Sequence, residues 1–119
     1  ESSMSVLQYS SSKHGDVTLV TISGSLDAQT APKFNEKLQG EIRKGAKKII
    51  CNLENLEFIA SAGLGILISV NQTLSKSSGE IRLSGMNAKI KKIFKVMGFI
   101  NIFKIYDNNE KGIDSFKKS

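Results

Sequence analysis

The sequence has little cysteine, histidine or proline, and it has no tryptophan. Its one cysteine, Cys51, cannot form an internal disulfide and stands in the apolar run at residues 49–53. A reactive thiol needs a charged and exposed setting, so we expect Cys51 to pack in the core as a small hydrophobe. A chain of 119 residues buries about two-thirds of its unfolded surface and needs no disulfide or metal to fold. The lack of paired cysteines fits a reducing compartment, and we expect a cytoplasmic protein.

No apolar run in the sequence is long enough to cross a membrane. The longest, residues 62–68, falls far short of the ~20 residues of a spanning helix. The N-terminus also lacks the basic and then apolar layout of a signal peptide. Glu1-Ser2-Ser3 ahead of Met4 is typical of an expression remnant. We therefore expect residues 4–119 to form a single domain to which residues 1–3 do not belong.

The sequence has few acidic residues relative to basic ones. It holds 11 aspartates and glutamates against 17 lysines and arginines, which gives a formal net charge of +6. Only Arg43 and Arg82 are arginine, the residue that reads bases and stacks on them most often. The excess charge therefore favours acidic partners or solubility over sequence-specific binding of nucleic acid.

The motifs of common enzyme classes are missing around Ser61, the serine that stands out in the sequence. A nucleophile elbow needs glycine two residues before the serine, where Ile59 stands. The chain's one histidine, His14, lies in an early turn. A phosphate-binding loop ending in Gly-Lys-Ser/Thr is absent, and a dinucleotide fingerprint starting at Gly63 would need a small residue in place of Ile68. With no cluster of metal ligands either, we expect no catalysis, cofactor or metal.

Signals for strands and helices alternate along the chain. Apolar residues recur at helical spacing, as at Phe34, Leu38 and Ile42, and runs rich in β-branched residues lie between these segments. The pattern predicts strands near residues 6–9 and over 17–22, 48–53, 80–84 and 102–106. It predicts a helix that Thr30 caps and Gly45 ends, helices over residues 61–75 and 88–97, a last helical turn around Ile113 and Phe116, and loops over 24–27 and 54–60. These elements predict an α/β fold with a mixed β-sheet and helices packed mainly on one face.

Ser61 stands where a loop is expected to turn into a helix. Small residues flank it, namely Ala60, Ala62, Gly63 and Gly65. Such residues leave the backbone bare, so that another protein can approach closely, although each glycine costs the helix about 0.5–1 kcal/mol relative to alanine. The alternative is that Ser61 only caps the helix, while the glycines let it pack tightly on the sheet.

Four segments of the chain follow one another in the order found in one bacterial family. They are Gly24-Ser25-Leu26-Asp27 with Thr30-Ala31, the strand at residues 49–53, the serine motif at residues 58–65, and Gly85-Met86-Asn87 followed by residues 93–94 and 97–99. One short motif would be weak evidence, but four in order are specific. From about Val17 to Phe116 the sequence resembles the STAS-domain anti-sigma factor antagonists, and this resemblance implies a STAS-like fold.

The resemblance implies a regulatory cycle in transcription. In that family the serine corresponding to Ser61 is phosphorylated by an anti-sigma factor that is also an ATP-dependent serine kinase. The unmodified antagonist binds this kinase and releases the sigma factor, and a PP2C-type phosphatase restores the antagonist. Many members have aspartate before the serine and a second serine after it, where this chain has Ala60 and Ala62. Asp27 is then the candidate for the nearby acidic group.

The same resemblance, with the expected position of these segments at one end of the sheet, predicts a partner-binding surface around Ser61. It consists of Ser25, Leu26, Asp27, Ala60, Ala62, Gly63, Leu64, Met86 and Asn87. From the residues alone, Leu64 and Met86 are equally consistent with core positions, and Asp27 with an acid of a turn or a helix entry.

Two other functions remain open on the sequence. One is a STAS subunit of another complex, such as a stress-signalling or transporter-associated assembly. The other is a basic nucleic-acid-binding domain that uses the lysines at residues 89–95, although a lysine-rich helix face is usually only solvated.

Overall fold

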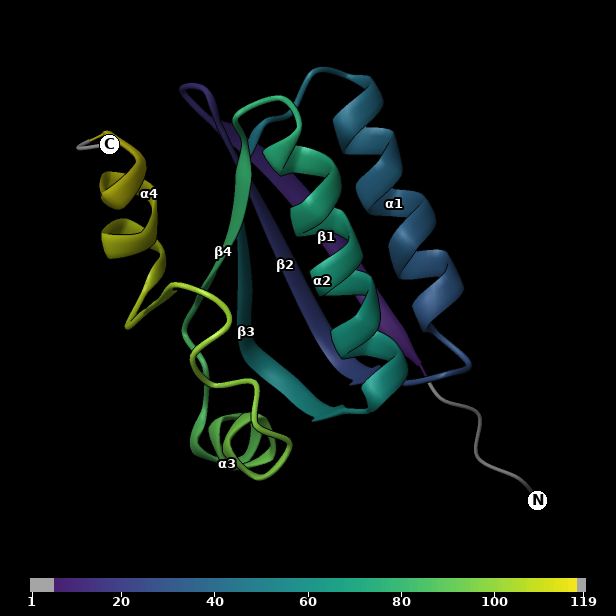
Figure 1. Ribbon diagram of the computed structural model, residues 1–119. Helices are drawn as coiled ribbons and strands as arrows, with labels where there is room; N and C mark the ends of the chain where they lie inside the picture. The colour runs from purple at the N-terminus through teal and green to yellow at the C-terminus, as the bar shows by residue number, and fades with distance from the viewer. Residues whose placement is uncertain (1–5, 118–119) are drawn as a thin grey trace.

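Strands and helices alternate along the chain in the structure, a computed structural model that describes residues 6–117 (Figure 1). The expected remnant at residues 1–3 lies outside this part. The elements are β1 (Leu7–His14), β2 (Val17–Leu26), α1 (Ala31–Arg43), β3 (Lys48–Ile59), α2 (Ser61–Ser75), β4 (Glu80–Ser84), α3 (Ala88–Val96), β5 (Ile105–Tyr106) and α4 (Asn109–Lys117). Within residues 6–117, no helix has both the length and the apolar character required to cross a membrane.

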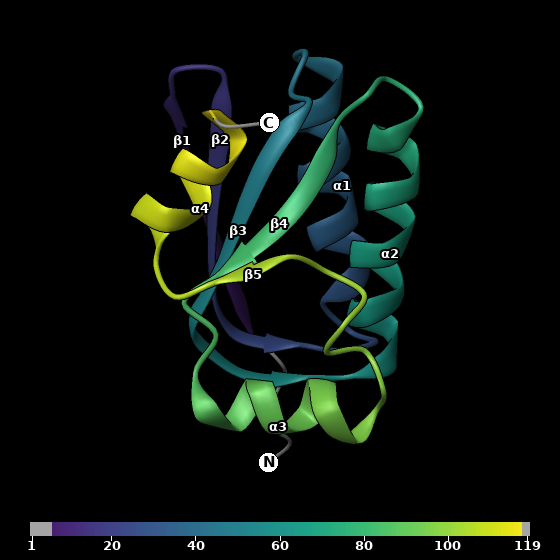
Figure 2. The ribbon, with the colours of Figure 1, turned by 60° about the vertical axis from the view of Figure 1, so that its left-hand side comes forward.

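The five strands form one mixed sheet in the order β1-β2-β3-β4-β5. Strand β1 runs antiparallel to β2, and the other neighbouring pairs are parallel. The predicted α/β fold with a mixed sheet is therefore confirmed. Because β2, β3 and β4 are parallel, the segments that follow them leave the sheet at the same end, where α3 and the start of α2 lie (Figure 2).

Strands β2 and β3 continue beyond their predicted ends. Residues 24–26 and 54–59, predicted as loops, belong to the sheet, and Leu26 pairs with Ile59 at the end of the two strands. Both side chains are buried, so this extension closes one end of the core. The prediction was wrong because two register shifts break the alternation of polar and apolar residues. Strand β5 is shorter than predicted, with only Ile105 and Tyr106 paired.

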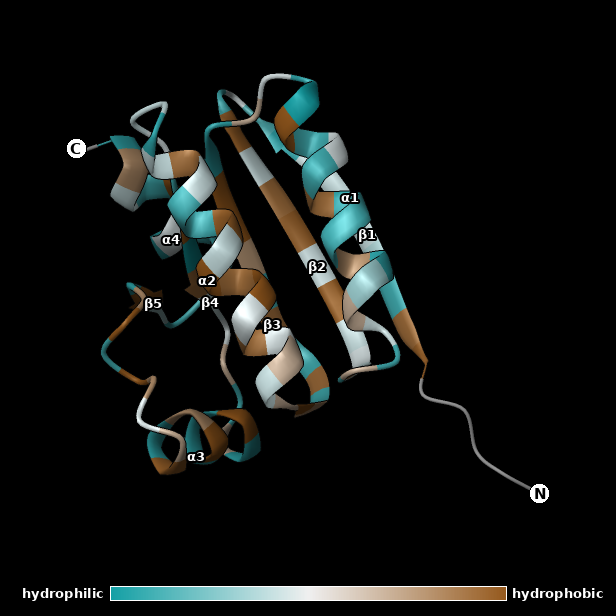
Figure 3. Cartoon of the chain, turned by 45° about the vertical axis from the view of Figure 1, so that its right-hand side comes forward, coloured by the Kyte–Doolittle hydropathy of each residue, from teal (hydrophilic) through white to brown (hydrophobic). Residues whose placement is uncertain are grey.

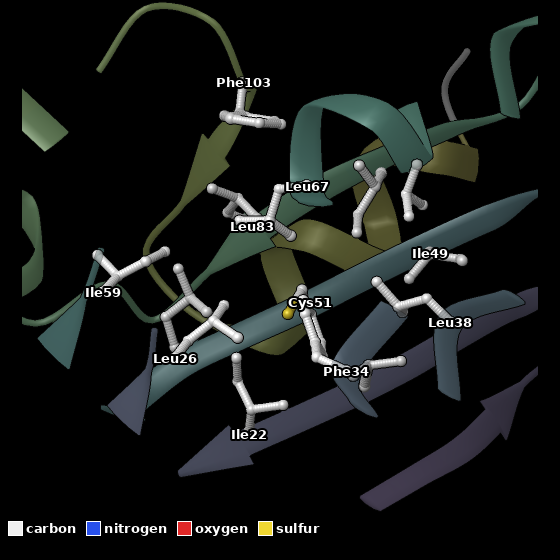
Figure 4. Close-up of a cluster of buried hydrophobic side chains, with 14 of the residues drawn as sticks. Ile22, Leu26, Phe34, Leu38, Ile49, Cys51, Ile59, Leu67, Leu83 and Phe103 are labelled. Atoms are coloured by element: carbon white, nitrogen blue, oxygen red, sulfur yellow. The ribbon is translucent and has the colours of Figure 1, made fainter. Parts of the chain in front are cut away.

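Helices α1 and α2 pack on one face of the sheet, and α4 covers part of the other face (Figures 1 and 2). The hydropathy pattern follows this arrangement, since much of α1 is polar and α2 is apolar over most of its length (Figure 3). In the core, Phe34 and Leu38 of α1 lie near Cys51 of β3 (Figure 4). Cys51 is buried, as predicted, and burial raises the pKa of its thiol to about 12.

A buried arginine attaches α4 to the sheet. Arg82 of β4 is 5% exposed and donates hydrogen bonds from Nε to Glu80 Oε1 at 2.8 Å and from Nη1 to Ser115 Oγ at 2.7 Å. Its guanidinium also lies 4.0 Å from the centre of the Phe116 ring. One side chain therefore joins β4 to both a polar and an aromatic residue of α4.

Replacing this arginine should loosen α4. We expect Arg82→Ala to lower the free energy of unfolding by roughly 3 kcal/mol, because Ser115 and Phe116 lose their contacts with the guanidinium and Glu80 is left with Lys104, 3.5 Å away. Urea denaturation followed by circular dichroism measures the change. Arg82→Lys is the matched control, since it keeps the charge beside Glu80 and should lose less. A urea midpoint of Arg82→Ala equal to that of the wild type would contradict this role.

Candidate functional site

Ser61 is the first residue of α2 and its side chain is exposed. Within residues 6–117 its hydroxyl makes no hydrogen bond. The N-cap position belongs to Ala60, which is extended (φ −105°, ψ 172°) and has no side-chain oxygen to offer. The alternative prediction, that Ser61 serves only as the N-cap of α2, is therefore wrong.

The amide-rich end of α2 is open around this serine. The amides of Gly63 and Leu64 both donate to the Ala60 carbonyl, whereas those of Ser61 and Ala62 have no acceptor in the part of the chain that the structure describes. The first turn of α2 contains no acidic residue. An anion carried by Ser61 would therefore meet two free amides and the positive end of the helix dipole.

The loop that follows β2 lies beside the start of α2. The Ala60 amide donates to the Leu26 carbonyl at 2.9 Å, so the residue after Leu26 is held next to the helix end that carries Ser61. This hydrogen bond joins the ends of two parallel strands at the point where each leaves the sheet. The structure thus places the loop of Asp27 close to Ser61.

Asp27 and Thr30 organise that loop. Asp27 Oδ1 accepts hydrogen bonds from the amides of Gln29 at 3.0 Å and Thr30 at 3.2 Å, which holds the turn into α1. The Thr30 hydroxyl donates to the Ser25 carbonyl at 2.8 Å and makes no cap bond to α1. Thr30 thus occupies the predicted N-cap position of α1, but its side chain makes no cap bond because its oxygen serves the loop.

The two glycines of α2 have different roles. An ideal Cβ on Gly63 would lie 2.5 Å from Leu26 Cγ and 3.1 Å from the Leu26 carbonyl oxygen, so only glycine lets α2 begin this close to β2. A Cβ on Gly65 would meet nothing within 4 Å. Packing within the described chain therefore explains Gly63 but leaves Gly65 as an exposed stretch of bare helix.

The residues predicted to bind a partner differ in how far they are buried. Leu26, Gly63 and Leu64 are buried within the fold and form packing beneath the surface in this conformation. As contacts for a partner these three residues stay predictions. Ala60 and Ala62 are partly exposed and flank Ser61, and no observation tests whether a partner touches them.

Asn87 and Met86 have structural roles at the start of α3. Asn87 Oδ1 accepts from the Ile90 amide at 2.9 Å, and Asn87 Nδ2 donates to the carbonyls of Glu54 at 3.0 Å and Leu56 at 2.8 Å. The amide group of Asn87 therefore caps α3 and joins it to the extended part of β3. Met86 is partly buried against the main core. As contacts for a partner, Met86, Ser25 and Asp27 stay predictions.

One exposed aromatic residue near Ser61 was missed. Phe58, near the end of β3, is 46% exposed and pairs in register with Ser25. The sequence signal for its exposure was the neighbouring Ile59. Adjacent residues of a strand point to opposite faces, and Ile59 is buried. Predicting a loop at residues 54–60 concealed this alternation.

The geometry argues against a hydrolytic Ser-His pair. His14 lies at the turn between β1 and β2 and pairs with Val17. Ser61 lies next to Leu26, at the opposite end of β2. Ten residues of strand span roughly 30 Å, so the imidazole cannot reach the serine hydroxyl. Among residues 6–117, no cluster of three or more histidine, cysteine or carboxylate side chains could hold a metal ion.

Known proteins share this sequence pattern and fold. The family model of the STAS domain matches residues 8–112. The anti-sigma F factor antagonist of Paenibacillus polymyxa is 29% identical over 103 residues, which cover 86% of this chain and 88% of that protein. An anti-sigma factor antagonist from Mycobacterium paratuberculosis has the same fold, with a TM-score of 0.84, 20% identity and coverage of 94% and 95%. The phosphorylated form of the Bacillus cell fate determinant SpoIIAA gives a TM-score of 0.70, with 22% identity and coverage of 92% and 99%.

Alanine at the two glycines of α2 should have opposite effects. We expect Gly65→Ala to raise the free energy of unfolding by about 0.5–1 kcal/mol, because a bare helix position gains alanine without a clash. Gly63→Ala should lower it by about 1–3 kcal/mol, because the new methyl group presses on Leu26. Urea denaturation of the two variants provides the comparison. If both changes destabilised the protein equally, the division of roles between the glycines would be wrong.

Proposed function

The chain belongs to the STAS domain family, and from that premise we propose that it is an anti-sigma factor antagonist that phosphorylation of Ser61 switches off. In its unmodified form it binds an anti-sigma factor that is also a serine kinase, and the sigma factor is released. ATP enters the cycle through the kinase, which transfers a phosphoryl group to Ser61. A PP2C-type phosphatase removes it. The chain itself catalyses nothing and acts in the cytoplasm.

The observation that carries the proposal is the position of the Ser61 hydroxyl. It is exposed, unpaired within the described chain and placed at the first residue of α2. A kinase has to bring its bound nucleotide within reach of this oxygen, and the small side chains of Ala60 and Ala62 leave room for that approach. Gly65, which faces open space on the next turn, extends the same bare surface.

A phosphoryl group at this position should leave the domain folded. Phosphoserine carries about −1.5 to −2 charges at neutral pH. The free amides of Ser61 and Ala62 and the helix dipole favour such an anion, typically by 0.3–1 kcal/mol. Because Ala60 replaces a carboxylate that many family members carry there, the phosphate meets no like charge at the N-cap. The switch therefore acts on the surface and not on folding.

Phosphorylation of Ser61 should be unfavourable for partner binding, although it is favourable for the fold. A partner that packs against Ser61 desolvates it, and a dianion left unpaired in such an interface costs about 2–5 kcal/mol or more. Since each 1.4 kcal/mol is a factor of ten in affinity, phosphorylation can weaken binding by roughly thirtyfold to several thousandfold. The nearby exposed Glu57 adds to the negative charge at this end of the molecule.

A charge at position 61 should reproduce the modified state. The binding partner is the anti-sigma factor kinase whose gene lies nearest to the gene of this protein. We expect Ser61→Glu to weaken binding to this kinase by at least about thirtyfold, because the carboxylate stays unpaired in the interface. Ser61→Ala should bind as the wild type does. Isothermal titration calorimetry measures the affinities, and far-UV circular dichroism should show the same fold for all variants.

Ser69→Glu is the matched control, because Ser69 is also exposed on α2 but lies two turns further along the helix. It should bind like the wild type. Equal affinities of Ser61→Ala and Ser61→Glu would remove the support for a switch at this serine.

A further inference from the structure

Helix α3 lies at the same end of the molecule as the start of α2 (Figure 2). It carries a row of exposed lysines. Four of its nine residues are lysine, namely Lys89, Lys91, Lys92 and Lys95, and all four are exposed. In the part of the chain that the structure describes, none of these lysines forms an ion pair. The helix itself contains no acidic residue. The exposed side of α3 therefore carries a concentrated positive charge, while the exposed carboxylates of Glu54 and Glu57 lie near its first lysine, Lys89.

Exposed apolar side chains come directly after the lysines in the sequence and continue into the next turn. Val96, the last residue of α3, is 76% exposed, Met97 is 37% exposed, and Ile102 in the next turn is 48% exposed. Together with Val6 and Phe58, they are the large apolar residues that the described fold leaves most open to solvent. The combination of unpaired lysines with uncovered apolar groups in residues 89–102 is not explained by packing within the chain.

The apolar residues are held on a defined turn. The Gly98 amide donates to the Lys95 carbonyl at 3.1 Å, and the Phe99 amide donates to the Phe94 carbonyl at 2.8 Å. With Gly98 in the left-handed region at φ 78°, these two bonds form the Schellman motif that ends many helices. The chain reverses there, so that Phe99 packs against the main core while Val96 is left outside.

The opposite side of α3 is fixed to the rest of the fold. Ile90 and Phe94 are fully buried, and the Asn87 side chain bonds both the start of α3 and the carbonyls of β3. The lysines and the apolar residues therefore occupy a rigid surface. Binding such a surface loses little conformational entropy, which favours its use for recognition.

We propose that the α3 surface, formed by Lys89, Lys91, Lys92, Lys95, Val96, Met97 and Ile102, is a second contact region for the kinase that Ser61 controls. The proposal rests on the function proposed above and adds the chemistry of the partner. The kinase surface that faces α3 is acidic and contains an apolar spot that receives Val96 and its neighbours. The lysines accelerate encounter with that surface, and the apolar contact slows dissociation.

A protein partner fits this surface better than a lipid bilayer does. Helices that bind membranes bury a broad apolar face among the acyl chains. Here the apolar face of α3, with Ile90 and Phe94, is used by the core, and the side chains left outside are confined to one end of the helix. Helix α3 lies at the same end of the molecule as the start of α2 (Figure 1), whose first residue is Ser61, so one partner can touch both regions.

Paired substitutions test the α3 surface. In Lys91→Glu/Lys92→Glu we expect the affinity for the kinase to fall roughly tenfold or more, with a weaker dependence on salt, because attraction becomes repulsion. In Val96→Ser/Ile102→Ser we expect a loss of similar size that salt does not alter. Lys44→Glu/Lys47→Glu is the matched control, since it makes the same charge change at the opposite end of the sheet and should bind within about twofold of the wild type. Circular dichroism checks that every variant is folded.

The outcomes separate this inference from the Ser61 switch. If Ser61→Glu abolishes binding but both α3 variants bind like the wild type, the α3 surface is not a contact and the switch stands. If the wild type binds no such kinase, the switch fails and the α3 proposal fails with it. Sedimentation with vesicles of 30% phosphatidylserine tests the membrane alternative. If the wild type sediments with the vesicles, Lys91→Glu/Lys92→Glu does not, and both bind the kinase equally, the surface binds a membrane and the proposal is overturned.

Discussion

The structure depends on the junction at which β3 ends and α2 begins. There the Ala60 amide donates to the Leu26 carbonyl, and Gly63 packs directly on the Leu26 side chain. These two contacts fix the first turn of α2 against the end of β2, and they leave Ser61 on the outer side of that turn. A larger residue at position 63 would push the helix away from the strand. The exposure of the serine hydroxyl and the openness of the amides beside it both follow from this close approach.

The same junction is less stable than it would be with other residues at positions 60 and 65. Ala60 leaves the N-terminus of α2 without a side-chain cap, which typically costs about 1 kcal/mol, and Gly65 costs a similar amount in the helix. The rest of the fold is well packed, with a continuous core between the sheet and α1 and α2, and with Arg82 holding α4 on the other face. The missing cap of α2 and Gly65 both lie on the surface that we propose a partner covers, as is common where function competes with stability.

Much of the fold could be predicted from the sequence because its helices have strong periodic patterns. Helix α2 begins and ends at the predicted residues, and the burial of Cys51 followed from its apolar neighbours. The ends of β2 and β3 could not be predicted, because register shifts interrupt the alternation on which strand prediction depends. Local sequence patterns also fail to show whether tertiary packing will bury a residue or leave it exposed. Leu26 and Leu64 looked like contacts for a partner but are buried, whereas Phe58 looked like part of a loop but is an exposed strand residue.

The central claim is that one serine changes the surface of the protein without changing its fold. Incubation with the anti-sigma factor kinase and ATP, followed by mass spectrometry and amide NMR spectra of the product, tests it directly. The account predicts one phosphoryl group, located on Ser61, with shifted amide signals confined to the start of α2 and the loop of Asp27. A phosphoryl group on another residue, or spectral changes spread through the sheet and the core, would contradict it.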